Sequence, residues 1–281
     1  MRAARRGSIA AKLAKPQALA APYVLWLAVF VAAPILIIAV FAFVRNGGGF
    51  TLSHFAEAAR SWKVFGRSFW LAFVATAICL LLGYPLAYVL SRESANVQRV
   101  MSMLIMLPMW MNFLLRTYAW MSILEENNGL LNRLLGFLRL PQLHIANSPT
   151  AVVIGMVYNF LPFMVLPLYS VLVKLDKRLV EAAQDLGATP VQVFRRVTFR
   201  LSLPGVISGV TMVFVPAVST FAISKLLGGG KSDLLGDLIE RNFLSNKPFG
   251  SAISLLMMVI CMVFIGLMNK FGDGGEGTLA I

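Results

Sequence analysis

The sequence predicts an all-α integral membrane protein with six transmembrane helices. The chain is 58% hydrophobic, only 13% of its 281 residues are charged, and its mean hydropathy is +0.78. A soluble domain contains about 25% charged residues, so this balance indicates membrane spans. A helix needs roughly 20 apolar residues to cross a bilayer. Six blocks meet that length, at about 22–44, 65–90, 99–123, 149–172, 203–226 and 250–270.

The first block follows a basic segment, residues 1–21. The block is longer than the apolar core of a signal peptide, which has about 7–15 residues, so we expect an uncleaved span. The first five blocks contain prolines, which spans tolerate because neighbouring helices satisfy the freed backbone groups. In the fifth block, Gly205 and Gly209 form a G-x-x-x-G pattern that allows close helix packing. The sixth block leads into the tail, residues 271–281.

The distribution of Lys and Arg predicts the orientation, because cytoplasmic loops carry an excess of both. With the N-terminus inside, the inner segments hold 14 Lys and Arg and the outer segments hold eight. We therefore expect a basic cytoplasmic arm at 1–21, a six-span domain at 22–270 and a cytoplasmic tail at 271–281. The polar loop at 173–203 also faces the cytoplasm, and both termini do.

Several other classes of function find no support in the sequence. The net charge of +13 would suggest nucleic-acid binding in a soluble protein, but here it follows the membrane topology. Cys79 and Cys261 lie inside apolar blocks, which predicts neither a disulfide nor a metal site. The "GGGKS" at 228–232 lacks the first glycine of a phosphate loop, because Lys225 stands in its place. No catalytic motif is present, so we expect no enzyme activity and no cofactor in this chain.

Three cations lie within or close to the predicted spans: Arg67, Arg116 and Lys225. We interpret Arg67 and Lys225 as side chains that reach the outer interface. Arg116 lies deeper, and both a contact between helices and a place in a pore remain open for it.

The loop at 173–203 has the pattern of a helix, a glycine turn and a second helix. Asp176 can cap the first helix, and Leu175, Leu179, Ala182 and Leu186 recur at helical spacing. Gly187 stands where a left-handed terminating residue is needed, and Thr189-Pro190 can begin the second helix. We expect both helices to lie under the membrane. The first suits docking into a groove of a partner, and lying along the lipid interface is the alternative.

The segment "EAAQDLGATPVQVFRRVTFRLSLPG" resembles the EAA loop of inner-membrane permease subunits of binding-protein-dependent ABC importers. The resemblance implies a type I importer permease fold and a cytoplasmic coupling helix that contacts an ATPase. The residues that it assigns to coupling are Glu181, Ala182, Ala183, Asp185, Leu186 and Gly187. Arg200 stands where the family pattern has a proline, which puts the end of the second helix in question.

The resemblance extends over most of residues 65–255, and there it is to the permeases of spermidine/putrescine importers. It is carried by "LGYPLAYVLSR", "LPMWMNFLLRTYAW" and "NKPFGSAIS". It implies a bacterial inner-membrane location and the import of polyamines. It also implies three partners: an ATPase dimer, a second homologous permease and a periplasmic or lipid-anchored binding protein.

A polyamine is a polycation, and aromatic faces or carboxylates can hold its ammonium groups. The third and fourth spans offer such groups, and Glu125 and Glu126 lie at the outer mouth of the third. The predicted pathway residues are Trp110, Asn112, Tyr118, Trp120, Glu125, Tyr158 and Asn159. For each aromatic residue, packing or a place in an interfacial belt is the alternative.

Two other functions remain open from the sequence. An ABC importer permease for another small cationic or organic solute would share every feature above. A secondary transporter would need inverted repeats or acidic residues in the middle of a span, and the sequence shows neither clearly. The outer segment 129–140 has leucines on one helical face and predicts an interfacial helix, with contact to the binding protein as the alternative.

Overall fold

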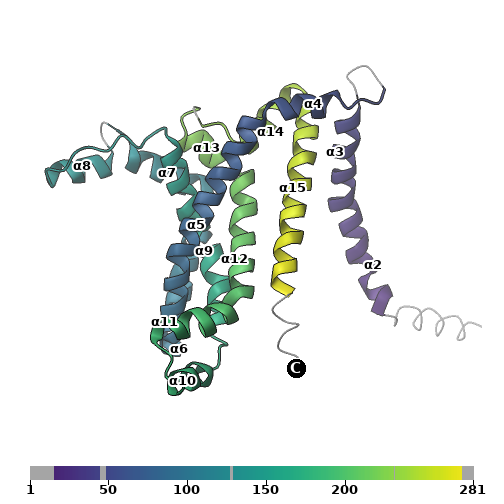
Figure 1. Ribbon diagram of the computed structural model, residues 1–281. Coiled ribbons are helices and arrows are strands. Elements are labelled where there is room, and N and C mark those ends of the chain that lie inside the picture. Colours follow the sequence, from purple (N-terminus) through teal and green to yellow (C-terminus); the bar gives the residue numbers. More distant parts are fainter. Residues whose placement is uncertain (1–15, 45–48, 127–128, 231, 274–281) are drawn as a thin grey trace, which may run out of the picture. The chain divides into compact units, whose positions relative to one another are not determined.

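The computed structural model describes residues 16–44, 49–126, 129–230 and 232–273 (Figure 1). Every regular element in these ranges is a helix, and Val44 and Phe50 form an isolated antiparallel bridge. The predicted all-α fold class is confirmed.

Five helices are long and apolar enough to cross a membrane: Pro22–Phe43, Trp62–Arg92, Pro149–Leu172, Pro190–Ser219 and Lys247–Lys270. A sixth candidate span consists of two helices that are apolar enough only when taken together, α6 (Ala95–Trp110) and α7 (Phe113–Leu124), which meet at 89°. The predicted third span at 99–123 therefore has the expected apolar length but is sharply bent. Met111 and Asn112 have extended backbones with ψ of 149° and 128°, so the helix cannot continue through them.

The chain divides into two compact units, and the larger comprises Arg60–Arg241 and Met258–Ile281. Its centre is formed by α5 (Trp62–Arg92), α9 (Pro149–Leu172) and α12 (Phe199–Ser219), which pack against one another (Figure 1). Fully buried side chains of α9, such as Met156, Met164 and Leu168, fill the space between them. Since α9 contacts both neighbours, it is the most buried of the spans.

The two glycines of the G-x-x-x-G pattern bring α12 close to α9. A β-carbon on Gly205 would lie 3.1 Å from the carbonyl oxygen of Pro167. A β-carbon on Gly209 would lie 2.7 Å from the Met164 sulfur, so no larger residue fits there without movement. The predicted close packing is confirmed for this pair of helices.

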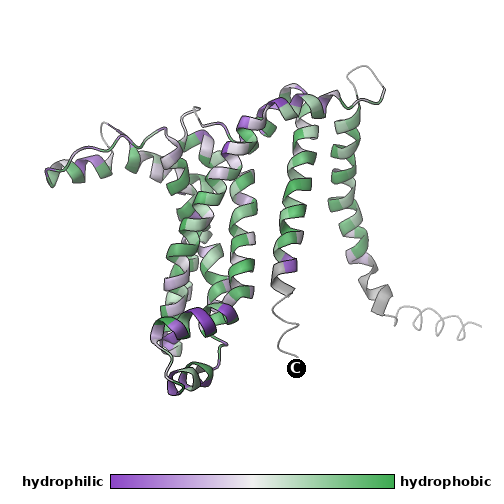
Figure 2. Cartoon of the chain, in the orientation of Figure 1, coloured by the Kyte–Doolittle hydropathy of each residue, from purple (hydrophilic) through white to green (hydrophobic). Residues whose placement is uncertain are grey.

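Short helices lie at both ends of the central bundle of the larger unit. At one lie α10 (Lys177–Asp185) and α11 (Pro190–Val193), and we call it the α10 end. At the other, the α13 end, lie α7, α13 (Ala222–Leu227) and α8 (Leu130–Phe137) (Figure 1). Helix α14 (Leu235–Ser245) begins there too. Figure 2 shows hydrophilic residues concentrated on α10, in contrast to the apolar central helices.

The fifth span differs from its prediction at both ends. The block 203–226 was expected to be one helix, but α12 ends at Ser219, because Thr220 is extended, and α13 is separate. At its start, α11 continues through a π-helical segment, η2 (Phe194–Thr198), directly into α12. The second helix of the loop is therefore continuous with the fifth span, and its position under the membrane stays a prediction.

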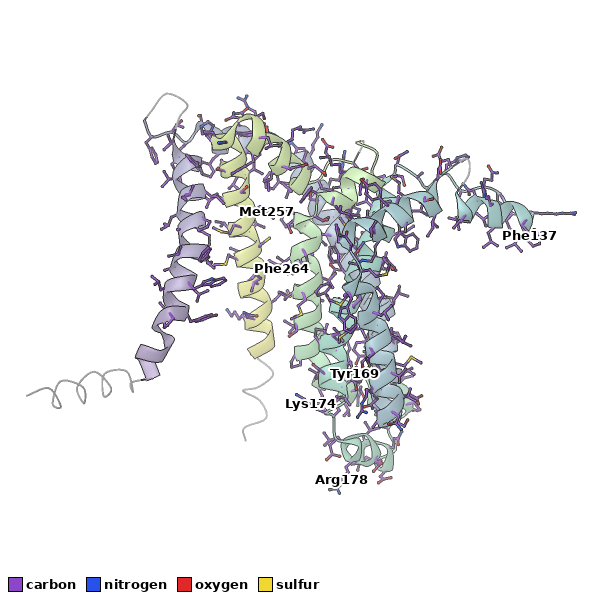
Figure 3. All side chains as sticks on the ribbon, turned by 180° about the vertical axis from the view of Figure 1, so that it is seen from behind. Phe137, Tyr169, Lys174, Arg178, Met257 and Phe264 are labelled. Carbon is purple, nitrogen blue, oxygen red and sulfur yellow. The ribbon has the colours of Figure 1, made fainter. Side chains whose placement is uncertain are left out.

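The smaller unit comprises Met1–Ala59 and Asn242–Met257. Its described part contains α2 (Pro16–Leu27), the π-helical η1 (Ala28–Ala32), α3 (Ala33–Phe43) and most of α4 (Ser53–Arg60). The Phe43 ring packs on those of Phe50 and Phe55, at 5.4 and 5.1 Å between centroids. Helix α15 (Lys247–Asp273) begins in this unit and ends in the larger one, and Figure 3 labels Met257 and Phe264 along it.

Candidate functional site

The first candidate site is the surface of α10. The side chain of Asp176 accepts a hydrogen bond from the Arg178 backbone N–H at 2.9 Å and begins this helix, as predicted. The predicted apolar stripe turns away from the chain: Leu179 is exposed and Leu186 is 89% exposed. Glu181, Ala182 and Asp185 are exposed as well, and Ala183 is half-buried. In Figure 3, Lys174 and Arg178 lie at this end of the larger unit.

Gly187 forms the predicted turn between the two helices. Its φ of +82° lies in the left-handed region, which glycine adopts without strain. The backbone N–H groups of Gly187 and Ala188 donate to the carbonyls of Gln184 and Ala183, at 2.8 and 3.1 Å. These bonds satisfy carbonyls at the end of α10 that would otherwise lack partners.

The second helix begins with a capping box. The Thr189 backbone N–H donates to the Gln192 side chain at 2.9 Å, and the Gln192 backbone N–H donates to the Thr189 hydroxyl at 3.4 Å. The helix then passes through Arg200 without a break, because Arg200 lies inside α12. The second helix therefore does not end at Arg200, the residue that replaces the proline of the family pattern.

An aromatic cluster joins this loop to α5. The Phe194 ring lies against Tyr84 and Tyr88, with centroids 5.6 and 6.2 Å apart, and Phe199 lies 5.9 Å from Tyr84. The Tyr84 hydroxyl also hydrogen-bonds the Ser202 hydroxyl at 2.8 Å. This aromatic cluster was not predicted from the sequence. Its signal is the spacing of Tyr84 and Tyr88, four residues apart and so on one face of a helix.

The second candidate site lies between α7 and α9. The rings of Trp120 and Tyr158 meet edge to face at 5.3 Å, so the structure brings these two predicted pathway residues together. The adjacent Asn159 is only 2% exposed and donates to the Gly155 carbonyl at 2.8 Å. Its side-chain oxygen has no hydrogen-bond partner among the described residues.

Three other predicted pathway residues are exposed or have a structural role. Trp110, at the end of α6, is 75% exposed, and Tyr118 is exposed too. Asn112 has a structural role, because its side-chain oxygen accepts from the backbone N–H groups of Leu114 and Leu115, at 2.9 and 3.3 Å. It therefore caps α7 at the break in the span.

The three cations predicted within or close to the spans have different environments. Lys225 forms an ion pair with Glu240 at 3.1 Å, and Arg67 is exposed near the start of α5. Arg116 is only 8% exposed, and its Nε and Nη1 have no hydrogen-bond partner among the described residues. Burying a guanidinium nitrogen without an acceptor is energetically costly, so Arg116 occupies an unfavourable environment in this chain.

Glu125 lies at the α13 end, where it lines a cavity of about 350 Å³. No group of three or more His, Cys, Asp or Glu side chains that could hold a metal ion occurs in the described part of the chain.

Comparison with known proteins places these features in a family. Residues 79–273 match the family described as binding-protein-dependent transport system inner membrane component. The spermidine/putrescine transport system permease protein PotB of Haemophilus influenzae is 40% identical over 253 residues, which cover 85% of this chain and 88% of that protein. The PotB protein of Escherichia coli strain K12 is 38% identical over 256 residues, covering 86% and 91%.

Solved structures show the same fold. A chain of a bacterial ABC transporter that imports the acidic polysaccharide alginate matches with a TM-score of 0.75 at 18% identity, covering 96% of this chain and 98% of that one. A chain of the MetNI methionine ABC transporter in an inward-facing conformation matches with a TM-score of 0.56 at 18% identity, covering 76% and 94%. The fold is that of a type I ABC importer permease. The chain belongs to the family of inner-membrane components of binding-protein-dependent transport systems, and it is a multi-pass membrane protein.

Proposed function

We propose that this chain is a permease subunit of an ATP-driven importer that moves polyamines, such as spermidine and putrescine, into the cytoplasm. One structural observation carries the permease role: the larger unit presents a short helix with an exposed apolar face at one end of a bundle of spans. The PotB relatives support the choice of polyamines, because they are named for spermidine and putrescine transport and share about 40% of their residues with this chain.

The α10 surface is the proposed contact with a separate ATPase subunit. Two such subunits form the proposed dimer, one for this chain and one for a second, homologous permease. The coupling residues are Glu181, Ala182, Ala183, Asp185, Leu186 and Gly187. An amphipathic helix that keeps its apolar residues exposed suits a groove in a partner. Because α10 contacts η2, a movement of this helix would reach α5 through Phe194 of η2.

The solute pathway is proposed to pass the Trp120–Tyr158 pair. The apolar blocks contain no Asp or Glu, so aromatic faces replace a charged site there. A cation over a ring gains roughly 0.5–2 kcal/mol, which holds a polyamine weakly enough to release it. Trp110, Asn112, Tyr118 and Asn159 complete the proposed pathway, and the second permease supplies the facing wall.

The proposed orientation places both termini and the α10 end in the cytoplasm. The excess of Lys and Arg on the inner segments supports it. The α13 end then faces outward, where a periplasmic or lipid-anchored binding protein would deliver the solute. No nucleic acid and no cofactor of this chain take part in the proposal.

The test is uptake by the complete complex in lipid vesicles. Labelled spermidine and putrescine are offered on the outside with the binding protein, ATP is enclosed, and an amino acid serves as competitor. We expect ATP-dependent polyamine uptake that the amino acid does not reduce. If the wild-type complex accumulates another solute and no polyamine, the proposed substrate is wrong.

The pathway is tested in the same assay with Trp120→Ala and Tyr158→Ala. Loss of a ring contact worth about 1.4 kcal/mol slows uptake tenfold. Trp70→Ala is the matched control, because Trp70 is an exposed aromatic side chain on α5. Wild-type uptake per ATP in both pathway variants would show that the two rings only pack the bundle.

A further inference from the structure

The cavity beside Glu125 combines polar and apolar walls. It lies at the α13 end, between the end of α7, the loop before α9, and α13, and its volume is about 350 Å³. Its lining includes three residues with polar side chains, Ser122, Glu125 and Asn147. Met121, Leu226 and Leu227 contribute apolar surface. Its size falls in the range of small-molecule sites, roughly 300–1,000 Å³.

Glu125 differs from the other acidic residues at this end. The Glu126 carboxylate lies 4.0 Å from His144 Nδ1, and Asp233 and Glu240 form ion pairs with Arg241 and Lys225. Within the described residues, the Glu125 side chain has neither a hydrogen bond nor an ion pair, and this exposed residue lines the cavity. The sequence placed both Glu125 and Glu126 at the outer mouth of the third span. In the structure, Glu126 lies near His144, whereas Glu125 lines the cavity.

Asn147 is held in place by its backbone and by a close neighbour. Its φ is +55°, a left-handed conformation that asparagine tolerates better than most residues. A β-carbon on Gly229 would overlap the Asn147 side chain, so the glycine leaves room for it. Asn147 therefore lies beside Gly229 and lines the cavity with a polar side chain.

We propose that this cavity is an entry subsite for a primary alkylammonium group, an inference that rests on the proposed polyamine transport. An ammonium has three N–H donors and no acceptor. Glu125, Ser122 and Asn147 offer oxygen acceptors from three side chains, one of which is a charged carboxylate. Met121, Leu226 and Leu227 then contact the methylene chain that follows. A calcium ion would need six to eight oxygen ligands, which this lining does not supply.

The position of the subsite fits a chain with more than one ammonium group. Glu125 follows Trp120 by five residues, which is roughly 7 Å along a helix axis at about 1.5 Å per residue. One ammonium in the cavity thus places the rest of the molecule toward the Trp120–Tyr158 pair. The subsite holds the solute between its release by the binding protein and its passage over the rings.

The test measures the charge and the occupancy of the cavity directly. Ala146 lines the same cavity, so Ala146→Cys places a thiol there without removing an acceptor. Cys79 and Cys261 are replaced by serine, and the complete complex is used. The thiol is reacted with the cationic aminoethyl and the anionic sulfonatoethyl methanethiosulfonate. We expect the cation to react faster, and spermidine or putrescine to slow the reaction more than NaCl of equal ionic strength.

Two charge variants give the matched comparison. Glu125→Gln should lower the ratio of cationic to anionic rates several-fold, because the carboxylate attracts the cationic reagent and repels the anionic one. Glu126→Gln should change the ratio less than twofold, since that carboxylate faces His144. An equal effect of both variants, or no reaction with either reagent, would overturn the subsite.

The outcomes also separate the subsite from the proposed function. Suppose that the wild-type complex transports no polyamine, but the thiol reaction depends on Glu125 and is slowed by added alkylammonium. The subsite is then supported, and the proposed polyamine transport is wrong. If polyamine uptake is normal and Glu125→Gln leaves the ratio of cationic to anionic rates unchanged, the subsite is wrong and the proposed function is not affected. A loss of ATPase stimulation by the binding protein in Glu125→Gln, with an unchanged ratio, would assign Glu125 to protein docking and refute the subsite.

Discussion

Leu186 gives the sharpest test of the α10 surface. A leucine that is 89% exposed in the isolated subunit contributes little to its folding, yet its position at the end of α10 suits burial in an ATPase subunit. We predict that Leu186→Ala weakens binding of the ATPase subunit and leaves the stability of the permease unchanged. Leu172→Ala is the matched control, because Leu172 is the same residue type near the same end and is only 5% exposed.

The magnitudes separate the two variants. Full burial of a leucine side chain is worth about 1.5–3 kcal/mol, and 1.4 kcal/mol is tenfold in affinity. Leu186→Ala should therefore weaken ATPase binding by roughly ten- to a hundredfold, with the free energy of unfolding within about 0.5 kcal/mol of wild type. Leu172→Ala should lower the free energy of unfolding by about 2–5 kcal/mol, because it leaves a cavity.

The assay uses the purified permease in lipid nanodiscs. Titration with the ATPase subunit gives the dissociation constant, and thermal unfolding of the same samples gives the relative stability. The reasoning fails if Leu186→Ala binds the ATPase subunit with wild-type affinity, or if its loss of binding comes with a loss of stability like that of Leu172→Ala.

Three further predictions concern the turn, the aromatic cluster and a buried acid. Gly187→Val should cost at least about 1–2 kcal/mol at the left-handed turn and reduce uptake per ATP, whereas Gly187→Asn should retain more, measured in vesicles. Tyr84→Phe removes the hydroxyl contact with Ser202 and should lower stability by about 1 kcal/mol, and Ser202→Ala should add little to it in thermal unfolding. Burial raises the pKa of Asp237, outweighing hydrogen bonds from Ser224 and the Leu234 backbone. Because the native state then binds more protons, stability should fall as pH rises from about 4 through the raised pKa, and Asp237→Asn should flatten that dependence in unfolding measured from pH 4 to 8.

The spans were predictable because a bilayer demands long apolar blocks, and the break in the third span was not. A hydropathy window averages over the whole segment, and the break occupies only Met111 and Asn112. The sequence signal for this break is Asn112, because asparagine favours the position that caps the start of a helix. Similarly, the apolar residues of α12 and α13 read as one block, although the extended Thr220 separates them.

The two candidate sites differ in how far the sequence could define them. The helix–glycine–helix pattern at Gly187 depends on neighbours within a few residues, so local rules found it. The pair of Trp120 and Tyr158 depends on how α7 returns against α9, and the sequence could only propose it as one of several candidates. Ser122 and Asn147 were missed for the same reason, because the cavity forms only when the loop before α9 reaches the end of α7.

The packing of the larger unit explains how the two sites can act together. Phe194 contacts Tyr84 on α5, and α12 packs closely on α9, which carries Tyr158 against Trp120. Close-packed helices transmit a displacement as a unit, because they have little free volume in which to absorb it. The bend at Met111 and Asn112 joins α6 to α7, and both of these helices contact α9. A push on α10 is therefore expected to move α5, α9 and α12 together, and so to shift Tyr158 on α9 relative to Trp120 on α7.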